Sequence, residues 1–124
     1  MDAEWVKLCQ APDFVVESPD VVIKFKDDRS HRVTVEEDAN EYVLRAFVVR
    51  QSTVASLPYL PLQVWMRNRA VSLVGFRIDR RGRLVGEAWV PKAGITASEF
   101  QLYLRTVAVE SDRFEYTLTG RDSE

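Results

Sequence analysis

Few residues in this 124-residue chain have the type and spacing that catalysis or metal binding requires. The sequence holds one histidine, His31, and one cysteine, Cys9, whereas a zinc site needs several His, Cys or carboxylate ligands. The two could form a nucleophile pair, but Cys9 suits an apolar helix position and His31 the start of a strand. The glycines lack the spacing of a phosphate-binding loop. The sequence therefore predicts no catalytic residue, no metal site and no cofactor.

Three carboxylates remain as possible proton donors or acceptors, namely Glu87, Glu110 and Asp112. We expect Glu110 and Asp112 to pair with arginines on a helix surface. The alternation of side chains around Glu87 leaves open whether it points into the core or out of it. Because a fold by itself supplies no chemistry, we expect a protein that is not an enzyme.

A cluster of arginines is the second feature that could bind a ligand. It comprises Arg77, Arg80, Arg81 and Arg83, all in one predicted hairpin. Arginines at such spacing could hold phosphates or an acidic partner. The alternative, which we favour, is a solvated turn whose charges discourage pairing between sheet edges. The net charge of −2 also argues against general binding of nucleic acid, which requires many phosphate contacts.

Composition and length place limits on the class of protein. A chain of 124 residues, 46% hydrophobic and 29% charged, is typical of one globular domain, here residues 1–124. One cysteine cannot form an internal disulfide, and the N-terminus is acidic and lacks a signal-peptide pattern. No apolar run approaches the roughly 20 residues that span a bilayer. We therefore expect a cytoplasmic protein without membrane contact.

The second half of the chain predicts a hairpin followed by one long helix. Two apolar runs, Val71–Ile78 and Leu84–Val90, flank a short glycine-containing turn. Thr96 and Glu99 then have the spacing of a helix capping box, and Gly120 offers a left-handed stop. The residues predicted to face the core along this helix are Phe100, Leu104, Val107, Ser111, Phe114 and Leu118.

The first half predicts a short helix and three strands. Asp2 is expected to cap a helix that contains Trp5 and ends before Pro12. Residues 14–16 could form a short strand, but the turn signal Ser18-Pro19-Asp20 interrupts it, and it is not counted among the three. Segments 21–25 and 31–35 alternate as hairpin partners. Segment 41–50 is apolar on both sides, which indicates a central strand.

Two prolines shape the middle of the chain. Pro58 and Pro61 forbid a continuous helix, so we expect an irregular or one-turn entry and then a helix over 62–70. The residues predicted to face inward from this helix are Val64, Trp65 and Asn68. If the prolines keep the entry extended, its apolar residues form a candidate interface. These residues are Leu57, Tyr59 and Leu60, and the alternative is a buried connection packed on the sheet.

The predicted order is helix, three strands, helix, two strands, helix, which defines an α+β fold with helices against an antiparallel sheet. Several segments of core and turn residues carry a resemblance to a known family. They are Trp65-Met66-Arg67-Asn68, Gly75-Phe76-Arg77-Ile78-Asp79, Gly82-Arg83-Leu84, Pro91, Gly94-Ile95-Thr96 and Asp112-Arg113-Phe114. In these the chain resembles the YbjN-like bacterial proteins, whose fold is similar to that of type III secretion chaperones. The resemblance implies a non-enzymatic, often dimeric protein with a role in chaperone-like binding or regulation.

A second apolar stripe runs along the last helix, nearly opposite the core stripe. Leu102, Val109 and Tyr116 lie seven residues apart and are flanked by charged residues, as interface residues commonly are. The alternative is that the first helix covers them within the same chain. We therefore expect a protein-interaction module that forms a homodimer and binds an unknown protein partner. The alternative function is regulatory binding of an acidic ligand or nucleic acid through the Arg77–Arg83 hairpin.

Overall fold

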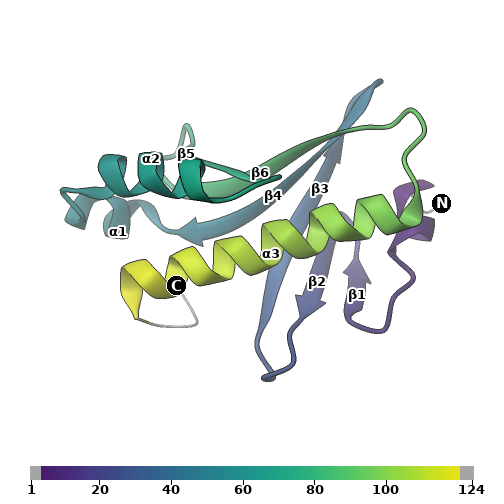
Figure 1. The fold of residues 1–124 in the computed structure, drawn as a ribbon, viewed down its shortest axis with the longest axis horizontal. Coiled ribbons are helices and arrows are strands. Elements are labelled where there is room, and N and C mark those ends of the chain that lie inside the picture. The colour runs from purple at the N-terminus through teal and green to yellow at the C-terminus, as the bar shows by residue number, and fades with distance from the viewer. Residues whose placement is uncertain (1–3, 121–124) are drawn as a thin grey trace.

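The computed structural model describes residues 4–120 as six strands, three α-helices and a 3-10 helix (Figure 1). Asp2, the predicted cap of the first helix, lies outside the described residues. The strands are β1 (Phe14–Glu17), β2 (Asp20–Lys24), β3 (Ser30–Glu37), β4 (Glu41–Val49), β5 (Gly75–Ile78) and β6 (Leu84–Pro91). The helices are η1 (Glu4–Cys9), α1 (Gln51–Ser56), α2 (Leu60–Ala70) and α3 (Ala97–Thr119).

All six strands form one antiparallel sheet in the order β1-β2-β3-β4-β6-β5. The predicted α+β class and the central position of β4 are confirmed. The number of strands before the first α-helix was predicted wrongly, because β1 is a strand of its own. The chain reverses at Ser18 and Pro19, which lets Phe14 pair with Ile23 of β2.

The core lies between the sheet and α3, which crosses one sheet face diagonally (Figure 1). Phe100, Leu104, Val107, Ser111 and Phe114 of the predicted core stripe are buried. The predicted capping box is also present, since Thr96 Oγ1 accepts from the Glu99 amide and Glu99 accepts from the Thr96 amide. The helix ends at Gly120 in a left-handed conformation, which a residue without Cβ adopts readily.

Gly86 of β6 allows α3 to approach the sheet closely. A Cβ atom added there would lie 2.5 Å from Ser111 Oγ and 2.8 Å from Phe76 Cε1. Phe76 of β5 in turn meets Phe114 edge to face, with ring centroids 4.9 Å apart. The missing side chain at position 86 therefore lets two aromatic rings and the helix close the core at this end of the sheet.

The middle of the chain differs from the prediction in two ways. The segment after Pro58 is helical and not extended, because α2 begins at Leu60 and Pro61 fits its first turn. The strand β5 begins only at Gly75, because the chain bends at Ser72 and Leu73, where Leu73 has φ of 72°. No described helix combines the length and apolar character that crossing a membrane demands.

Candidate interaction surfaces

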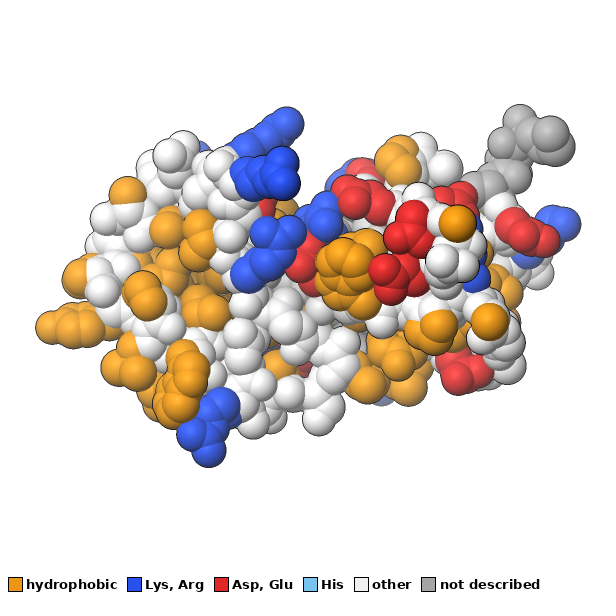
Figure 2. All heavy atoms as spheres, turned by 90° about the horizontal axis from the view of Figure 1, so that it is seen from above, with side chains coloured by type: hydrophobic (Ala, Val, Ile, Leu, Met, Phe, Trp, Pro, Cys, Tyr) orange, Lys and Arg blue, Asp and Glu red, His pale blue; other side chains and the backbone are white. Residues whose placement is uncertain are grey.

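The outer face of α2 exposes several large apolar side chains together. We define this face by Tyr59, which caps the helix, and by Leu62, Trp65 and Met66, each of which is more than half exposed. Figure 2 shows hydrophobic side chains gathered at the end of the molecule that carries α1 and α2. Trp65 was predicted to face inward, and this was wrong: its side chain is 56% exposed.

The inner face of α2 explains why Trp65 is left outside. Leu60 is 1% exposed and Val64 packs against the core cluster, so the turn between them already fills the space beside the sheet. Asn68, predicted to face inward, accepts a hydrogen bond from the Phe76 amide and donates one to the Phe76 carbonyl. This amide therefore caps the backbone of the edge strand β5, which discourages another strand from pairing there.

The candidate interface residues of the middle segment divide between surface and core. Tyr59 is 74% exposed, whereas Leu57 is partly buried against the core. Leu60 was predicted as an interface residue, and this was wrong. Helix formation turns its side chain into the core of its own chain, where no partner can reach it. The sequence signal that was missed is the apolar run from Leu60 to Met66, which places large side chains on both faces of one helix.

The second stripe on α3 is a surface feature in this structure. Leu102 and Tyr116 are both about half exposed and Val109 is partly buried. The first helix, predicted as the alternative cover, is η1, which lies beside the start of α3. Gln101 donates to the Leu8 carbonyl at 2.8 Å, and Trp5 lies against Phe100. The packing of η1 therefore leaves all three stripe residues accessible to some degree.

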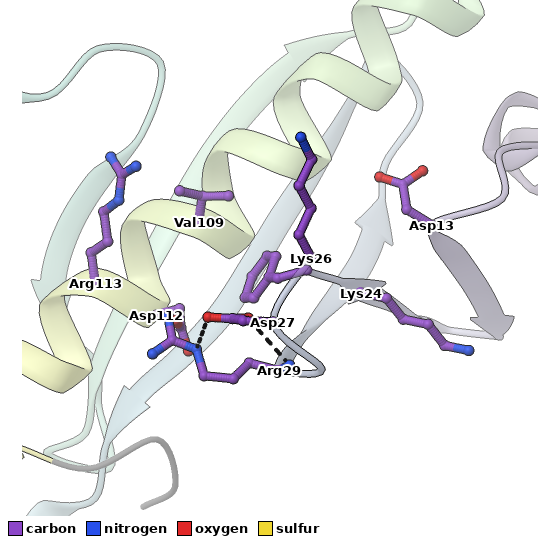
Figure 3. A pocket seen from close by; sticks show the side chains of 9 residues that line it. Asp13, Lys24, Lys26, Asp27, Arg29, Val109, Asp112 and Arg113 are labelled. Atoms are coloured by element: carbon purple, nitrogen blue, oxygen red, sulfur yellow. Dashed lines mark hydrogen bonds and ion pairs between the residues drawn. The ribbon is translucent and has the colours of Figure 1, made fainter.

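Val109 forms one wall of a groove of about 660 Å³ between α3 and the turn that joins β2 to β3 (Figure 3). The residues that line the groove are Asp13, Lys24, Phe25, Lys26, Asp27, Arg29, Val109, Asp112 and Arg113. The alternating segments 21–25 and 31–35 predict a hairpin, but nothing in their pattern indicates that its turn reaches α3. The contact is an ion pair, in which Arg29 Nη2 donates to Asp112 Oδ2 at 2.6 Å.

Asp112 belongs to a buried polar network and not to the helix surface as predicted. Its side chain is 3% exposed, and its other oxygen lies 3.7 Å from His31 Nδ1. His31 Nε2 donates to the Phe47 carbonyl at 2.7 Å. His31, Asp112 and Glu115 bring their ligand atoms within 4.8 Å of one another. The pairing of Asp112 with Arg29 already compensates its charge, so the network ties β3 and its turn to α3. The other helix carboxylate, Glu110, lies 3.5 Å from Arg113, as predicted for a surface pair.

The arginine hairpin has fewer uncommitted charges than its sequence indicates. Arg77 donates twice to the Glu87 carboxylate, at 2.7 and 3.0 Å, and Arg83 donates to Asp79 at 2.9 Å. Arg80 and Arg81 are exposed and make no ion pair with a residue in the described range 4–120. All four arginines, with Arg45 and Asp79, line one hollow of about 220 Å³. The candidate anion site is therefore a partly neutralised surface.

Two residues considered for chemistry are held in unreactive states. Burial raises the pKa of the Cys9 thiol to about 11, which leaves almost none of the reactive thiolate at neutral pH. Glu87 is 6% exposed on the sheet face opposite α3. Burial alone would raise the pKa of its carboxyl, but hydrogen bonds from Arg77 and Arg45 hold that pKa below its usual value. A carboxylate fixed between two guanidinium groups is poorly suited to proton transfer.

Comparison with known proteins finds the fold among solved structures. No family model and no curated protein matches the chain. A chain of the heterodimeric ExoU-SpcU complex from the type III secretion system of Pseudomonas aeruginosa has a TM-score of 0.61 at 16% identity, covering 86% of this chain and 89% of that one. YbjN from E. coli has a TM-score of 0.53 at 16% identity, covering 86% and 78%. The Yersinia pestis type III secretion chaperone SycH, solved with a fragment of YscM2, has a TM-score of 0.51 at 10% identity, covering 93% and 92%.

These likenesses confirm the resemblance that the residues of the second half carry. They extend over most of each chain, including the first half, where the sequence pattern was less informative. At such identities the similarity concerns the arrangement of elements and not particular side chains. The chain therefore has the fold that YbjN shares with the type III secretion chaperones.

Proposed function

We propose that this chain is a non-catalytic, chaperone-like protein-interaction module that forms a homodimer through the outer face of α2 and binds a protein partner. The observation that carries the proposal is that α2 is apolar on both sides. Its inner side packs into the core, whereas Leu62, Trp65 and Met66 remain exposed. A helix with two apolar faces is expected to be covered on both.

A second copy of the chain suits this face for physical reasons. In a twofold dimer the same patch occurs on both subunits, so an apolar helix face can cover its own copy. Trp, Tyr and Met are enriched in interface cores, while a charged rim is typical of interface edges. Arg69 provides such an edge, with its guanidinium 4.8 Å from the centre of the Trp65 ring. Leu62, Trp65 and Met66 are each already about half buried in the single chain, so association would add only the burial of the exposed half.

The comparisons support the second half of the proposal, binding of a protein partner. Two of the similar structures are complexes with another protein, ExoU-SpcU and SycH with a YscM2 fragment. We extend this from those proteins to the present chain as a proposal. A cytoplasmic location is part of it, because one buried cysteine is compatible with a reducing compartment.

The proposal is tested by Trp65→Glu, with the molar mass measured by light scattering. A carboxylate at position 65 would lose its hydration on entering an apolar contact, which is costly without a partner charge. We expect the mass to fall from that of two chains to that of one. Because Trp65 is exposed in the single chain, we also expect the cooperative thermal transition of the subunit to persist.

Trp89→Glu is the matched control. Trp89 is 58% exposed, but it lies on β6 and faces away from α3, because alternate residues of that strand enter the core. The same substitution at equal exposure should leave the mass at two chains. A dimer that survives Trp65→Glu but dissociates in Trp89→Glu would move the interface to the sheet and contradict the proposal.

A further inference from the structure

The groove between α3 and the β2–β3 turn has an apolar floor and a surplus of positive charge. Figure 3 shows Val109 between the side chains of Lys26 and Arg113, which come from opposite sides, and Phe25 also lines the groove. Phe25 and Val109 are both partly buried, so each still offers apolar surface to an incoming group.

The acidic groups around this groove are already paired within the chain. Asp13 accepts two hydrogen bonds from Arg105, at 2.8 and 2.9 Å. Asp27 and Asp112 both pair with Arg29, at 3.4 and 2.6 Å. Arg105 and Arg29 thus pair with three carboxylates, and Arg29 serves two of them. Four cationic side chains that line the groove, Lys24, Lys26, Arg29 and Arg113, therefore face three carboxylates, which leaves one positive charge in excess.

The basic groups at the groove are less committed. Lys24 and Lys26 form no ion pair with any residue between 4 and 120. Arg113 has its closest carboxylate, Glu110, at 3.5 Å, and its side chain is largely exposed. In a chain whose net charge is −2, this local surplus favours an anionic occupant.

The apolar surface extends beyond the groove along α3. Leu102 and Tyr116 lie seven residues to either side of Val109, and a helix rises about 1.5 Å per residue, so the three span about 21 Å. A small organic anion would cover only the middle of this surface. A polypeptide segment that alternates apolar and acidic side chains would match its length, its apolar floor and its charge.

We infer that the α3 groove binds an acidic, apolar segment of a protein partner, with a carboxylate between Lys26 and Arg113 and an apolar side chain on Phe25 and Val109. This inference rests on the proposed function as a protein-interaction module. It concerns a surface separate from the outer face of α2, and it specifies the chemistry of the partner segment.

The test uses a fluorescein-labelled decapeptide of alternating leucine and glutamate, with an alternating leucine and lysine decapeptide for comparison. We expect the acidic peptide to raise fluorescence anisotropy and to shift the NMR signals of residues 25–29 and 109–113. Binding of the basic peptide should be at least tenfold weaker. Equal binding of the two peptides, no binding of the acidic one, or shifts elsewhere would overturn the inference.

Two double charge reversals distinguish an effect of the groove from an effect of the protein's net charge. The double variant Lys26→Glu with Arg113→Glu should weaken binding of the acidic peptide at least tenfold. The double variant Arg80→Glu with Arg81→Glu changes the net charge by the same amount, but on the hairpin, and should leave the affinity for the acidic peptide unchanged. Equal losses in both variants would contradict the inference. Because all four side chains are exposed, both variants should keep the molar mass of the unaltered protein, so failure here is distinct from failure of the α2 dimer.

Discussion

Glu87 is a buried charge that links neighbouring strands of the sheet. Its carboxylate joins Arg45 of β4 to Arg77 of β5, across the strand that carries it. Removing the negative charge would leave two guanidinium groups facing each other with weaker acceptors between them. A hydrogen bond to a charged group contributes about 1.5–3 kcal/mol to the stability of a folded protein.

We predict that Glu87→Gln lowers the free energy of unfolding by about 1–3 kcal/mol at pH 7. The pKa of Glu87 is lower in the folded chain than in the unfolded one. Its charge therefore stabilises the fold above the unfolded pKa of about 4.3, and this contribution is lost as the pH falls through the folded value. Urea unfolding at pH 7 and near pH 3 measures the difference, which should shrink in acid. A difference that stays constant with pH would contradict the role of the charge.

At the scale of elements, α3 fixes the fold through its core stripe more than through its cap. Phe114 meets Phe76 edge to face, and the Arg67 guanidinium lies 4.7 Å from the centre of the Phe114 ring. The capping box involves Thr96 and Glu99, both exposed at the other end of the helix. Loss of a buried ring leaves a cavity, whereas loss of a cap leaves amides that water can reach.

Phe114→Ala should therefore lower the free energy of unfolding by about 3–5 kcal/mol, and Thr96→Ala by about 1 kcal/mol. Urea unfolding at one fixed protein concentration gives both values, since the stability of a dimer depends on concentration. Similar losses for the two variants, or a loss below about 1 kcal/mol for Phe114→Ala, would show that the stripe is not the anchor of the core.

The sequence predicted α3 closely because its signals are local. The cap, the stop and the spacing of apolar residues all lie within the helix itself. The orientation of Trp65 could not be predicted in this way, because α2 has apolar residues on both faces and its contacts with β5 decide which face is buried. The link between Arg29 and Asp112 was missed because 83 residues separate the partners. Which turn reaches which helix is a property of the assembled sheet.

At the scale of the whole molecule, charge distribution argues against nucleic acid as the partner. The hairpin offers Arg80 and Arg81 to solvent, while Arg77 and Arg83 are paired with carboxylates. Binding to a phosphate backbone requires several uncompensated cations, and its strength falls steeply with salt. We predict that the protein passes through a heparin column unretained at low salt. Retention that is lost in Arg80→Glu with Arg81→Glu would instead favour the regulatory alternative.

The homodimer is tested most directly by the molar mass of the unaltered protein, measured by light scattering over a series of concentrations. The outer face of α2 predicts a mass twice the 14.3 kDa of one chain, with dissociation toward a single chain on dilution. A mass of one chain at every concentration would contradict the proposed dimer and would leave the exposed face of α2 without a second copy to cover it.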